Sequence, residues 1–377
     1  MRRAWWFNPE NDGALARNTA NYTPPAAALK LHQAGEALPL WLAGEGDAVI
    51  CNGLNDKWLR RLQDGFGIAA GPWDHNPEGY TPAPWGWSAA ARRFFTLNGF
   101  DNSALPSPET LAVWRMLSHR RTGAKLAGEL ATATGLTLWP EAKEADSAAA
   151  LAEAMSAPGN YVLKSPWSSS GRGVVFVPEN RRDKAIRSAE GIIRSQGSVM
   201  VERAARRLLD FALLWDCEAE GCRFLGYSVF RTDESGAYRG NIVDRQEALR
   251  EIIGRHIDIG IIDRVAAAVP KALGKVLGSR YTGPAGIDML VAETADGPVL
   301  DAVVEVNLRY TMGFVALALA RIAGVPSLFS VERGDISSSC RAEVSGGKLT
   351  GGRLALTQPG NDFTFTLTAE VDSTINQ

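Results

Sequence analysis

Short apolar runs alternate with amphipathic stretches along the first half of the chain, and this alternation predicts a domain of mixed helices and strands. The apolar run of residues 4–7 reads as a buried strand and stops at the turn-rich sequence NPEND. A helix is expected from Pro24 or Pro25 to about residue 34, strands at LPLWLA and DAVICN, and another helix over residues 56–66. Alternating short strands and helices are typical of an α/β domain.

Residues 71–87 break this alternation. They are dense in Pro, Gly and Trp, which disfavour both helix and strand, so the stretch predicts a long ordered loop. Ser88 is expected to cap a helix that begins near Ala89. A loop of this length either binds something or packs against a neighbouring domain, and the sequence leaves both possibilities open.

Helical patterns return after Pro106-Ser107-Pro108, and a domain border close to residue 115 is expected. Gly135 ends one helix as a C′ glycine, and Pro158-Gly159 ends another. The expected helices cover about residues 109–120, 123–134, 147–157, 182–196 and 262–277, with one more after Met312. Strands are expected at SVMVER, around DFALLWDCEAEGCRFLGYSVFR, at AGIDMLVAE and VLDAVVEVNLR, and in a short β-like tail.

Composition places the chain among globular proteins of two or three domains. Of its 377 residues, 45% are hydrophobic and 22% charged, and the net charge of −2 provides no large field for nucleic acid. No secretory h-region follows the N-terminus, and the longest apolar stretch, residues 313–325, is interrupted by Arg321 and is too short to span a membrane. We therefore expect a cytoplasmic protein with neither nucleic-acid nor membrane partners.

The four cysteines, Cys51, Cys217, Cys222 and Cys340, are too sparse for a disulfide framework. Cys217 and Cys222 flank EAEG and are expected to lie across a hairpin. No second pair or nearby His completes a zinc set, so reduced thiols in a sheet are favoured over metal or redox use.

The sequence YVLKSPWSSSGRGVVFV, residues 161–177, contains the parts of a phosphate site in an unusual order. A P-loop places its lysine after the glycines, where a helix begins, whereas Lys164 comes first and ends an apolar run. A Ser/Gly turn over residues 168–173 leads into a second apolar run. This pattern predicts a strand, a flexible loop and a second strand.

A second candidate cluster lies in GIDMLVAETADGPVLDAVVEVNLRYTMG. Because side chains alternate across a strand, Glu305, Asn307 and Arg309 share one face, and a hairpin through ETADGP would bring Asp288 beside Glu305. Carboxylate and amide oxygens are ligands that Mg²⁺ prefers. The alternative is a solvated sheet face whose charges pair across strands, but it leaves the Lys164 hairpin unexplained. Together the two clusters describe a nucleoside triphosphate site.

This combination resembles the ATP-grasp superfamily over about residues 116–325, in VLKSPWSSSGRGV and GIDML…VVEVNLRYTMG. The resemblance implies an ATP-grasp fold of two α+β subdomains preceded by an N-terminal α/β domain. The implied domains are residues 1–115 for the N-terminal domain, 116–200 for a small subdomain with the lid hairpin, 201–330 for a large subdomain with the metal site, and 331–377 for a β-like extension.

The resemblance also implies roles for individual residues. Lys164 matches the lysine on the α- and β-phosphates, Glu202 the hinge at the adenine, and Asp210 the acid at the ribose hydroxyls. The implied lid loop contains Ser168, Ser169, Ser170, Gly171 and Gly173. The implied magnesium ligands are Asp288, Glu305 and Asn307. Arg309 matches the arginine that faces the transferred phosphoryl group or acyl-phosphate.

Several assignments stay open at this point. Arg121 and Lys125 compete as the second basic residue on the phosphates, and Glu202 could instead pair with a surface arginine. Arg245 either binds a substrate carboxylate or phosphate or forms a salt bridge near Asp244. Asn8, Glu10 and Asp12 follow the first strand, at the end where α/β sheets commonly bind ligands.

The expected function is that of an ATP-dependent ligase that joins a carboxylate to an amine and releases ADP and phosphate. ATP and two Mg²⁺ ions are the implied cofactors, with Mn²⁺ as an alternative metal, and the expected partners are small-molecule carboxylate and amine substrates. The alternatives are a small-molecule kinase of the same fold and an ATP-binding module without turnover. The identity of the substrates and the oligomeric state are not encoded in any motif recognised in the sequence.

Overall fold

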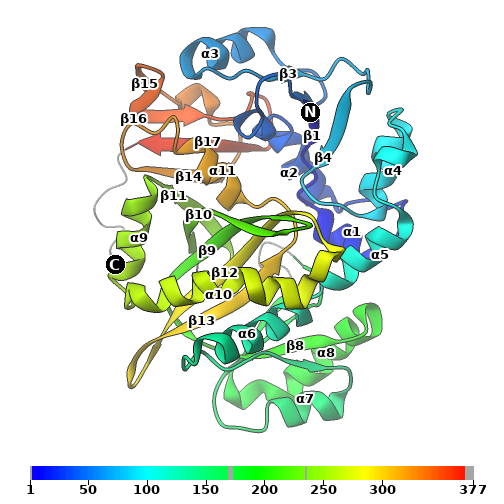
Figure 1. The fold of residues 1–377 in the computed structure, drawn as a ribbon, viewed down its shortest axis with the longest axis vertical. Coiled ribbons are helices and arrows are strands. Elements are labelled where there is room, and N and C mark those ends of the chain that lie inside the picture. Colours follow the sequence, from blue (N-terminus) through cyan, green and yellow to red (C-terminus); the bar gives the residue numbers. More distant parts are fainter. Residues whose placement is uncertain (1, 169–172, 234–235, 370–377) are drawn as a thin grey trace. The chain divides into compact units, whose positions relative to one another are not determined.

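The computed structural model describes residues 2–168, 173–233 and 236–369, and the chain divides into two compact units (Figure 1). The N-terminal unit comprises residues 1–111, 239–249 and 309–377. The central unit comprises residues 112–238 and 250–308. The fourfold division expected from the sequence stays a prediction.

The first sheet of the N-terminal unit is parallel throughout. Its strands are β1 (Arg2–Trp6), β2 (Ala48–Ile50), β3 (Gly71–Pro72) and β4 (Tyr80–Pro84), in the order β3-β2-β1-β4. The alternation of strands and helices in the sequence is thereby confirmed as an α/β sheet. The helices of this unit are α1 (Asn11–Arg17), α2 (Ala26–Gly35), α3 (Asp56–Phe66), α4 (Ala89–Leu97) and α11 (Met312–Leu319), while α5 (Pro108–Leu117) and α9 (Gln246–Gly254) cross its borders.

Strand β4 corrects the prediction of a continuous loop over residues 71–87. It pairs in register with β1, placing Pro82 opposite Ala4 and Pro84 opposite Trp6. Proline lacks the N–H that a central strand needs, but β4 is the edge strand of its sheet and has one neighbour only. The proline-rich sequence is therefore compatible with a strand at this place. The cap predicted at Ser88 is confirmed, since its hydroxyl accepts a hydrogen bond of 3.3 Å from Ala91 N.

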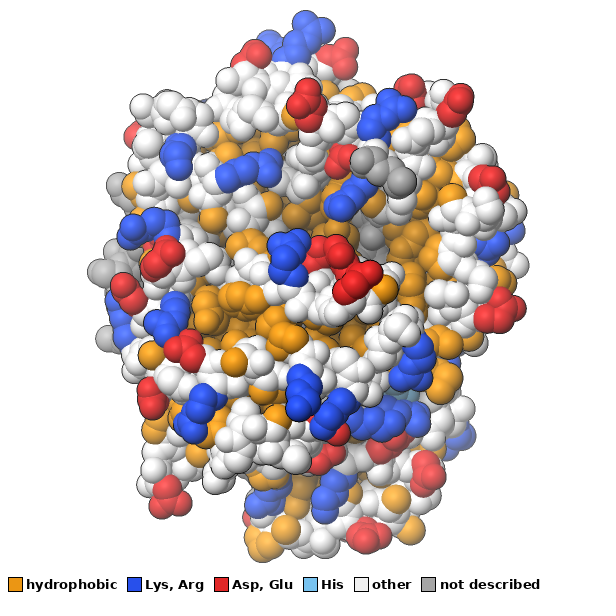
Figure 2. Space-filling view, in the orientation of Figure 1, with side chains coloured by type: hydrophobic (Ala, Val, Ile, Leu, Met, Phe, Trp, Pro, Cys, Tyr) orange, Lys and Arg blue, Asp and Glu red, His pale blue; other side chains and the backbone are white. Residues whose placement is uncertain are grey.

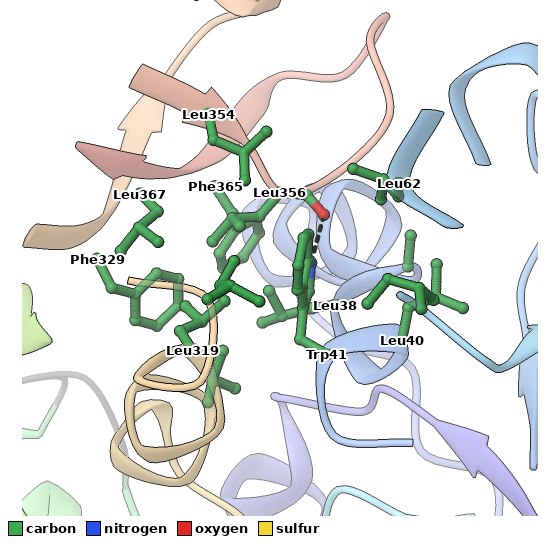
Figure 3. Packing of buried hydrophobic residues seen from close by; sticks show 14 of the residues in the cluster. Leu38, Leu40, Trp41, Leu62, Leu319, Phe329, Leu354, Leu356, Phe365 and Leu367 are labelled. Atoms are coloured by element: carbon green, nitrogen blue, oxygen red, sulfur yellow. Dashed lines mark hydrogen bonds between the residues drawn. The ribbon is translucent and has the colours of Figure 1, made fainter. Parts of the chain in front are cut away.

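The predicted strand at LPLWLA is wrong, because residues Leu38–Trp41 form a 3₁₀ helix. All four residues are buried, so the sequence shows no alternation of polar and apolar positions by which the two structures could be told apart. The indole of Trp41 lies in the core and donates a hydrogen bond of 2.9 Å to the carbonyl oxygen of Leu356 (Figure 3).

The other strands of the N-terminal unit are β11 (Tyr238–Val243), β14 (Ser327–Arg333), β15 (Ala342–Ser345), β16 (Lys348–Ala355) and β17 (Phe363–Ala369). They pair antiparallel in the order β11-β14-β17-β16-β15, which confirms the β-like tail. Phe329, Phe365 and Leu367 from these strands pack with Trp41 and Leu319 in one hydrophobic cluster (Figure 3).

The central unit contains two antiparallel arrays of four strands. The smaller array has the order β5-β8-β6-β7, with β5 (Lys143–Ala145), β6 (Tyr161–Lys164), β7 (Val174–Val177) and β8 (Val199–Arg203). Helices α7 (Ala148–Ala154) and α8 (Arg182–Gln196) pack on it around the buried side chains of Leu151, Leu163 and Val201. The larger array runs β13-β12-β9-β10, with β9 (Arg206–Glu218), β10 (Gly221–Thr232), β12 (Gly283–Thr294) and β13 (Gly297–Asn307).

Helices α6 (Arg121–Thr134) and α10 (Ile259–Leu277) pack against each other beside the larger array, α6 on β13 and α10 on β10 (Figure 1). Gly135 ends α6 in the left-handed conformation, at φ 65°, as the sequence predicted. Short 3₁₀ turns occur at Asn102–Ala104, Glu179–Arg181, Gly278–Arg280 and Ser337–Ser339.

The prediction of reduced thiols at Cys217 and Cys222 is wrong, because the two form a disulfide. The β9–β10 hairpin was expected, but its register places these two residues directly opposite each other, with a Cα–Cα distance of 4.0 Å. Cys51 and Cys340 are free.

Acidic and basic side chains are interspersed on the face shown in Figure 2, in keeping with the small net charge of the chain. None of the helices formed by the described residues combines the length and the apolar character needed to cross a membrane.

Candidate functional site

The Lys164 hairpin has the predicted arrangement. Strands β6 and β7 pair antiparallel, with Lys164 opposite Val174, and Ser165 N donates a hydrogen bond of 2.8 Å to Gly173 O. Gly173 has φ 74°, and a Cβ atom there would lie 2.6 Å from Ser165 Oγ, so the position requires glycine. Of the predicted lid residues, Ser168 and Gly173 are described, whereas Ser169, Ser170 and Gly171 lie outside the described residues.

Lys164 is 4% exposed and its ammonium contacts the carboxylate of Glu202. The two residues come from neighbouring strands, because β6 pairs with β8 and places Val162 opposite Glu202. Apart from this ion pair, Lys164 Nζ has no hydrogen-bond partner among the described residues. Glu202 therefore pairs with Lys164 and not with a surface arginine, and a buried ammonium with few partners is available to an anionic ligand.

A further carboxylate, that of the half-buried Asp301 on β13, lies beside this pair and was missed in the sequence. Burial, and secondly the charge of Glu202, raise the pKa of Asp301 from 3.8 to about 6, while Lys164, a hydrogen bond from Val303 N and Arg207 oppose the rise. The signal for Asp301 was present, because it lies four residues before Glu305 and so shares its face of the strand.

The three predicted metal ligands lie at one end of the β12–β13 hairpin. Asp288 pairs directly opposite Glu305, and Asn307 Nδ2 donates a hydrogen bond of 3.0 Å to Asp288 Oδ2. No group of three or more His, Cys, Asp or Glu residues suited to a metal occurs among the described residues, so the donors here are two carboxylates and one amide. This set suits Mg²⁺, which is commonly held by one or two carboxylates together with substrate phosphates.

Arg120 connects the metal-ligand candidates to the base of the lid loop. Its guanidinium lies 3.0 Å from Glu305 Oε2 and donates hydrogen bonds to the carbonyl oxygens of Ser165, at 3.0 Å, and Ser168, at 3.2 Å. The Arg120 side chain is only 8% exposed. A buried guanidinium that touches both clusters is well placed to bind a phosphate group.

Sequence reasoning pointed to the neighbours of Arg120 instead. Arg121 points elsewhere and forms an ion pair of 3.1 Å with Glu144, and Lys125 is exposed on α6. The HRR sequence contains no signal that singles out one of two adjacent arginines, because α6 begins at this point and its register decides which one is buried.

Lys164, Glu202, Asp288, Glu305 and Arg120 line one cavity of about 550 Å³ within the central unit, whereas Asn307, Ser168 and Gly173 are not among its lining residues. Its volume lies in the range of small-molecule sites. Asp210 also lines it, but its carboxylate already accepts hydrogen bonds from Arg207, at 3.0 Å, and Thr232, at 2.7 Å. The charged residues of the lining are Arg120, Lys164, Glu202, Arg203, Arg207, Asp210, Asp233, Asp288, Asp301 and Glu305.

Two predicted residues belong to the N-terminal unit and are not brought into this cavity. Arg309 binds the carboxylate of Asp12 through Nη2 at 2.7 Å and through Nε at 3.1 Å. Arg245 is exposed, and its backbone N–H donates to the side chain of Asp244 at 2.7 Å. The roles expected for both residues stay predictions.

No protein-family model and no curated protein matches the chain. Among solved structures, N5-carboxyaminoimidazole synthetase from Staphylococcus aureus in complex with ADP is similar, with 10% identity and a TM-score of 0.51 over 91% of this chain and 92% of the other. A biotin carboxylase–β,γ-ATP complex from Campylobacter jejuni has 13% identity and a TM-score of 0.51, over 98% of this chain and 87% of the other. At these identities the likeness shows the fold alone.

Proposed function

We propose, from the likeness of its fold to these two structures, that the chain is a member of the ATP-grasp superfamily and an ATP-dependent ligase that joins a carboxylate to an amine. Both similar structures are nucleotide complexes, which supports nucleotide binding here. The observation that supports the proposal is that Lys164, Arg120, Asp288 and Glu305 line the same cavity.

The positively charged side chains of the cavity would bind the phosphates. Lys164 would leave Glu202 and contact the α- and β-phosphates, and Arg120 would bind a phosphate oxygen close to Glu305. Ser168 and Gly173 belong to the loop that would cover the nucleotide, together with Ser169, Ser170 and Gly171. Glu202 and its neighbouring backbone would meet the adenine, and Asp210 the ribose.

Asp288, Glu305 and Asn307 would hold one or two Mg²⁺ ions, with Mn²⁺ as an alternative. The metal, when bound, supplies positive charge next to the phosphates. The chain itself has to orient its ligands for this, and the hydrogen bond from Asn307 to Asp288 fixes both side chains at one end of the hairpin.

In the proposed reaction, an oxygen of the substrate carboxylate attacks the γ-phosphorus, the bond to the β-phosphate oxygen breaks, and its electron pair leaves with ADP. The amine then attacks the acyl carbon of the acyl-phosphate, loses a proton, and displaces inorganic phosphate. Positioning and charge neutralisation by Lys164, Arg120 and Arg309 account for the catalysis, because phosphoryl transfer requires little covalent chemistry from the protein. Arg245 would bind a carboxylate or phosphate group of the substrate.

The test is ³¹P NMR of the purified protein with Mg-ATP and pooled amino acids, small peptides, polyamines and hydroxy acids. Glu305→Gln serves as the inactive variant, because it removes one carboxylate charge from the metal-ligand candidates. Glu129→Gln is the matched control, since Glu129 forms an ion pair with Lys275 on the surface, outside the cavity.

Phosphate and ADP that form only when a carboxylate and an amine are both present, with wild type and Glu129→Gln but not with Glu305→Gln, are the expected result. A new phosphoester signal would instead assign a kinase. ATP binding without turnover under every condition would assign a non-catalytic module, and turnover by Glu305→Gln equal to wild type would refute the metal-ligand assignment.

A further inference from the structure

The segment that follows β1 lies where the strand order of the parallel sheet reverses direction. The order β3-β2-β1-β4 means that the chain builds outward from β1 to β2 and β3 and then returns to the other side of β1 as β4. Open α/β sheets bind ligands at the carboxyl ends of the strands on either side of such a reversal. The side chain of Asn8 connects the segment after β1 to the segment after β4. Its Nδ2 donates a hydrogen bond of 2.9 Å to the carbonyl oxygen of Gly86, and its Oδ1 accepts one of 3.2 Å from Gly86 N.

One nearly buried contact between a carboxylate and an imidazole, and one nearly buried ion pair, lie in this segment. Glu10 Oε1 is 3.0 Å from His32 Nδ1, with side chains 9% and 11% exposed. Asp12 Oδ2 is 2.7 Å from Arg309 Nη2, with both side chains 13% exposed. The segment therefore presents carboxylates together with a guanidinium and an imidazole within the N-terminal unit.

Asn11, between the two carboxylates in sequence, is the unexplained residue. It is 2% exposed, and its Oδ1 is buried without a hydrogen-bond partner among the described residues. Such a group destabilises a fold unless something else offsets the lost hydrogen bond. A Cβ on Gly86 would lie 2.5 Å from Asn11 Nδ2, so the amide occupies the space that a side chain after β4 would fill. The side chain of Asn11, which follows β1, thus packs against Gly86, which follows β4.

We propose that this cluster, Glu10, Asn11, Asp12, His32 and Arg309, binds a small zwitterion that carries a primary ammonium and a carboxylate, as an α-amino acid does. The inference rests on the proposed ligase and names the class of its activated substrate. Glu10, Asp12 and Asn11 Oδ1 accept from the ammonium, while the guanidinium of Arg309 receives the carboxylate.

The charge of the cluster favours a zwitterion over a ligand of one sign. A ligand with both charges exchanges with the existing pairs and leaves each protein charge with a partner. A simple carboxylate that takes Arg309 would leave Asp12 nearly buried and unpaired, which is unfavourable. Arg309 is also one of the residues to which the proposed function gives charge neutralisation, so the carboxylate that it would hold is the one that the proposed reaction would phosphorylate.

The test uses Mg-ATP and hydroxylamine, which converts an acyl-phosphate to a hydroxamate and phosphate. The twenty common α-amino acids are compared with the same molecules without the amino group, propionate for alanine being one such pair. At least one amino acid is expected to yield hydroxamate with a kcat/KM at least tenfold above that of its deaminated partner. This comparison needs no variant and so does not depend on how a variant folds.

Glu10→Gln is expected to raise the KM for that amino acid at least tenfold, with kcat within about twofold and the Kd for ADP unchanged. Glu45→Gln is the matched control, because Glu45 is exposed in the same unit. Equal use of the deaminated carboxylates, or an unchanged KM in Glu10→Gln, would overturn the zwitterion site and leave the ligase standing. Absence of hydroxamate from both classes would overturn the site and the ligase together.

Discussion

Replacement of Asp301 by asparagine tests the electrostatics of the cavity most directly. Asp301 lies beside Glu202 and Lys164, and burial together with the Glu202 charge raises the pKa of its carboxyl from 3.8 to about 6. A carboxyl whose pKa is higher in the folded state stabilises the fold most when it is protonated. Its contribution to the free energy of unfolding is therefore fully present below pH 3.8 and is lost as the pH rises through about 6.

The magnitude follows from this pKa. At about 1.4 kcal/mol for each pKa unit, ionisation of Asp301 lowers the free energy of unfolding by about 3 kcal/mol once the pH is well above 6. Asparagine stays uncharged, and its Oδ1 can still accept the hydrogen bond that Val303 N donates at 3.3 Å. Asp301→Asn should therefore be more stable than wild type by up to about 3 kcal/mol at pH 8, and by about 1.5 kcal/mol less than that at pH 5.

The assay is urea unfolding of wild type and Asp301→Asn at pH 5, 6, 7 and 8. Asp296→Asn is the matched control, because Asp296 is exposed in the turn of the same hairpin. The advantage of Asp301→Asn over wild type should grow with pH, while Asp296→Asn should show no such trend. An advantage that is constant over this range, or a loss of stability at pH 8, would refute the account of Asp301.

Three further predictions concern binding and stability. Lys164→Ala should weaken ADP binding at least tenfold in isothermal titration calorimetry, because it removes the buried ammonium; unchanged affinity would contradict its assignment. Burial, and secondly the positive charges of Arg121, Arg115, Arg120 and Lys125, lower the pKa of His119 from 6.5 to about 3. As the pH falls, the unfolded chain therefore binds a proton at His119 before the folded chain does. Stability should consequently fall by about 2 kcal/mol more between pH 7 and pH 5 in wild type than in His119→Gln, as urea unfolding would measure. Gly352→Ala should lower the thermal midpoint, because the glycine has φ 71° and an added Cβ would lie 2.0 Å from Arg341 O; an unchanged midpoint would contradict that.

The elements that sequence reasoning identified correctly are those with a local signal. The β6–β7 hairpin is defined by two apolar runs around a Ser/Gly turn, and the β12–β13 hairpin by one short turn. The exact pairing of Asp288 with Glu305 also depends on a register shift between residues 288 and 290, for which the sequence contains no signal. Strand β4 and the 3₁₀ helix at Leu38–Trp41 lacked such signals. In the first, an edge position tolerated prolines, and in the second, burial on all sides removed the polar and apolar alternation.

Within the candidate site, the residues that were missed depend on tertiary structure. Arg120 and Arg121 are adjacent, and only the helix that begins there determines which guanidinium reaches Glu305. Asp301 shares a face with Glu305, yet its pKa is raised by burial and secondly by the charge of Glu202, which is about a hundred residues away in sequence. Both causes arise only in the folded chain. The disulfide of Cys217 and Cys222 likewise depended on the register of β9 with β10.

The cations proposed to bind ligands are already paired with carboxylates. Lys164 contacts Glu202 and Arg120 contacts Glu305 in the central unit, and Arg309 contacts Asp12 in the N-terminal unit. A ligand anion must therefore replace a carboxylate at each cation, and the released carboxylate needs a new positive partner or a proton. Mg²⁺ would meet this need at Glu305, and the ammonium of the proposed zwitterion would meet it at Asp12. The paired carboxylates thus favour ligands that arrive with both signs of charge, which is why the nucleotide is expected with its metal and the second substrate as a zwitterion.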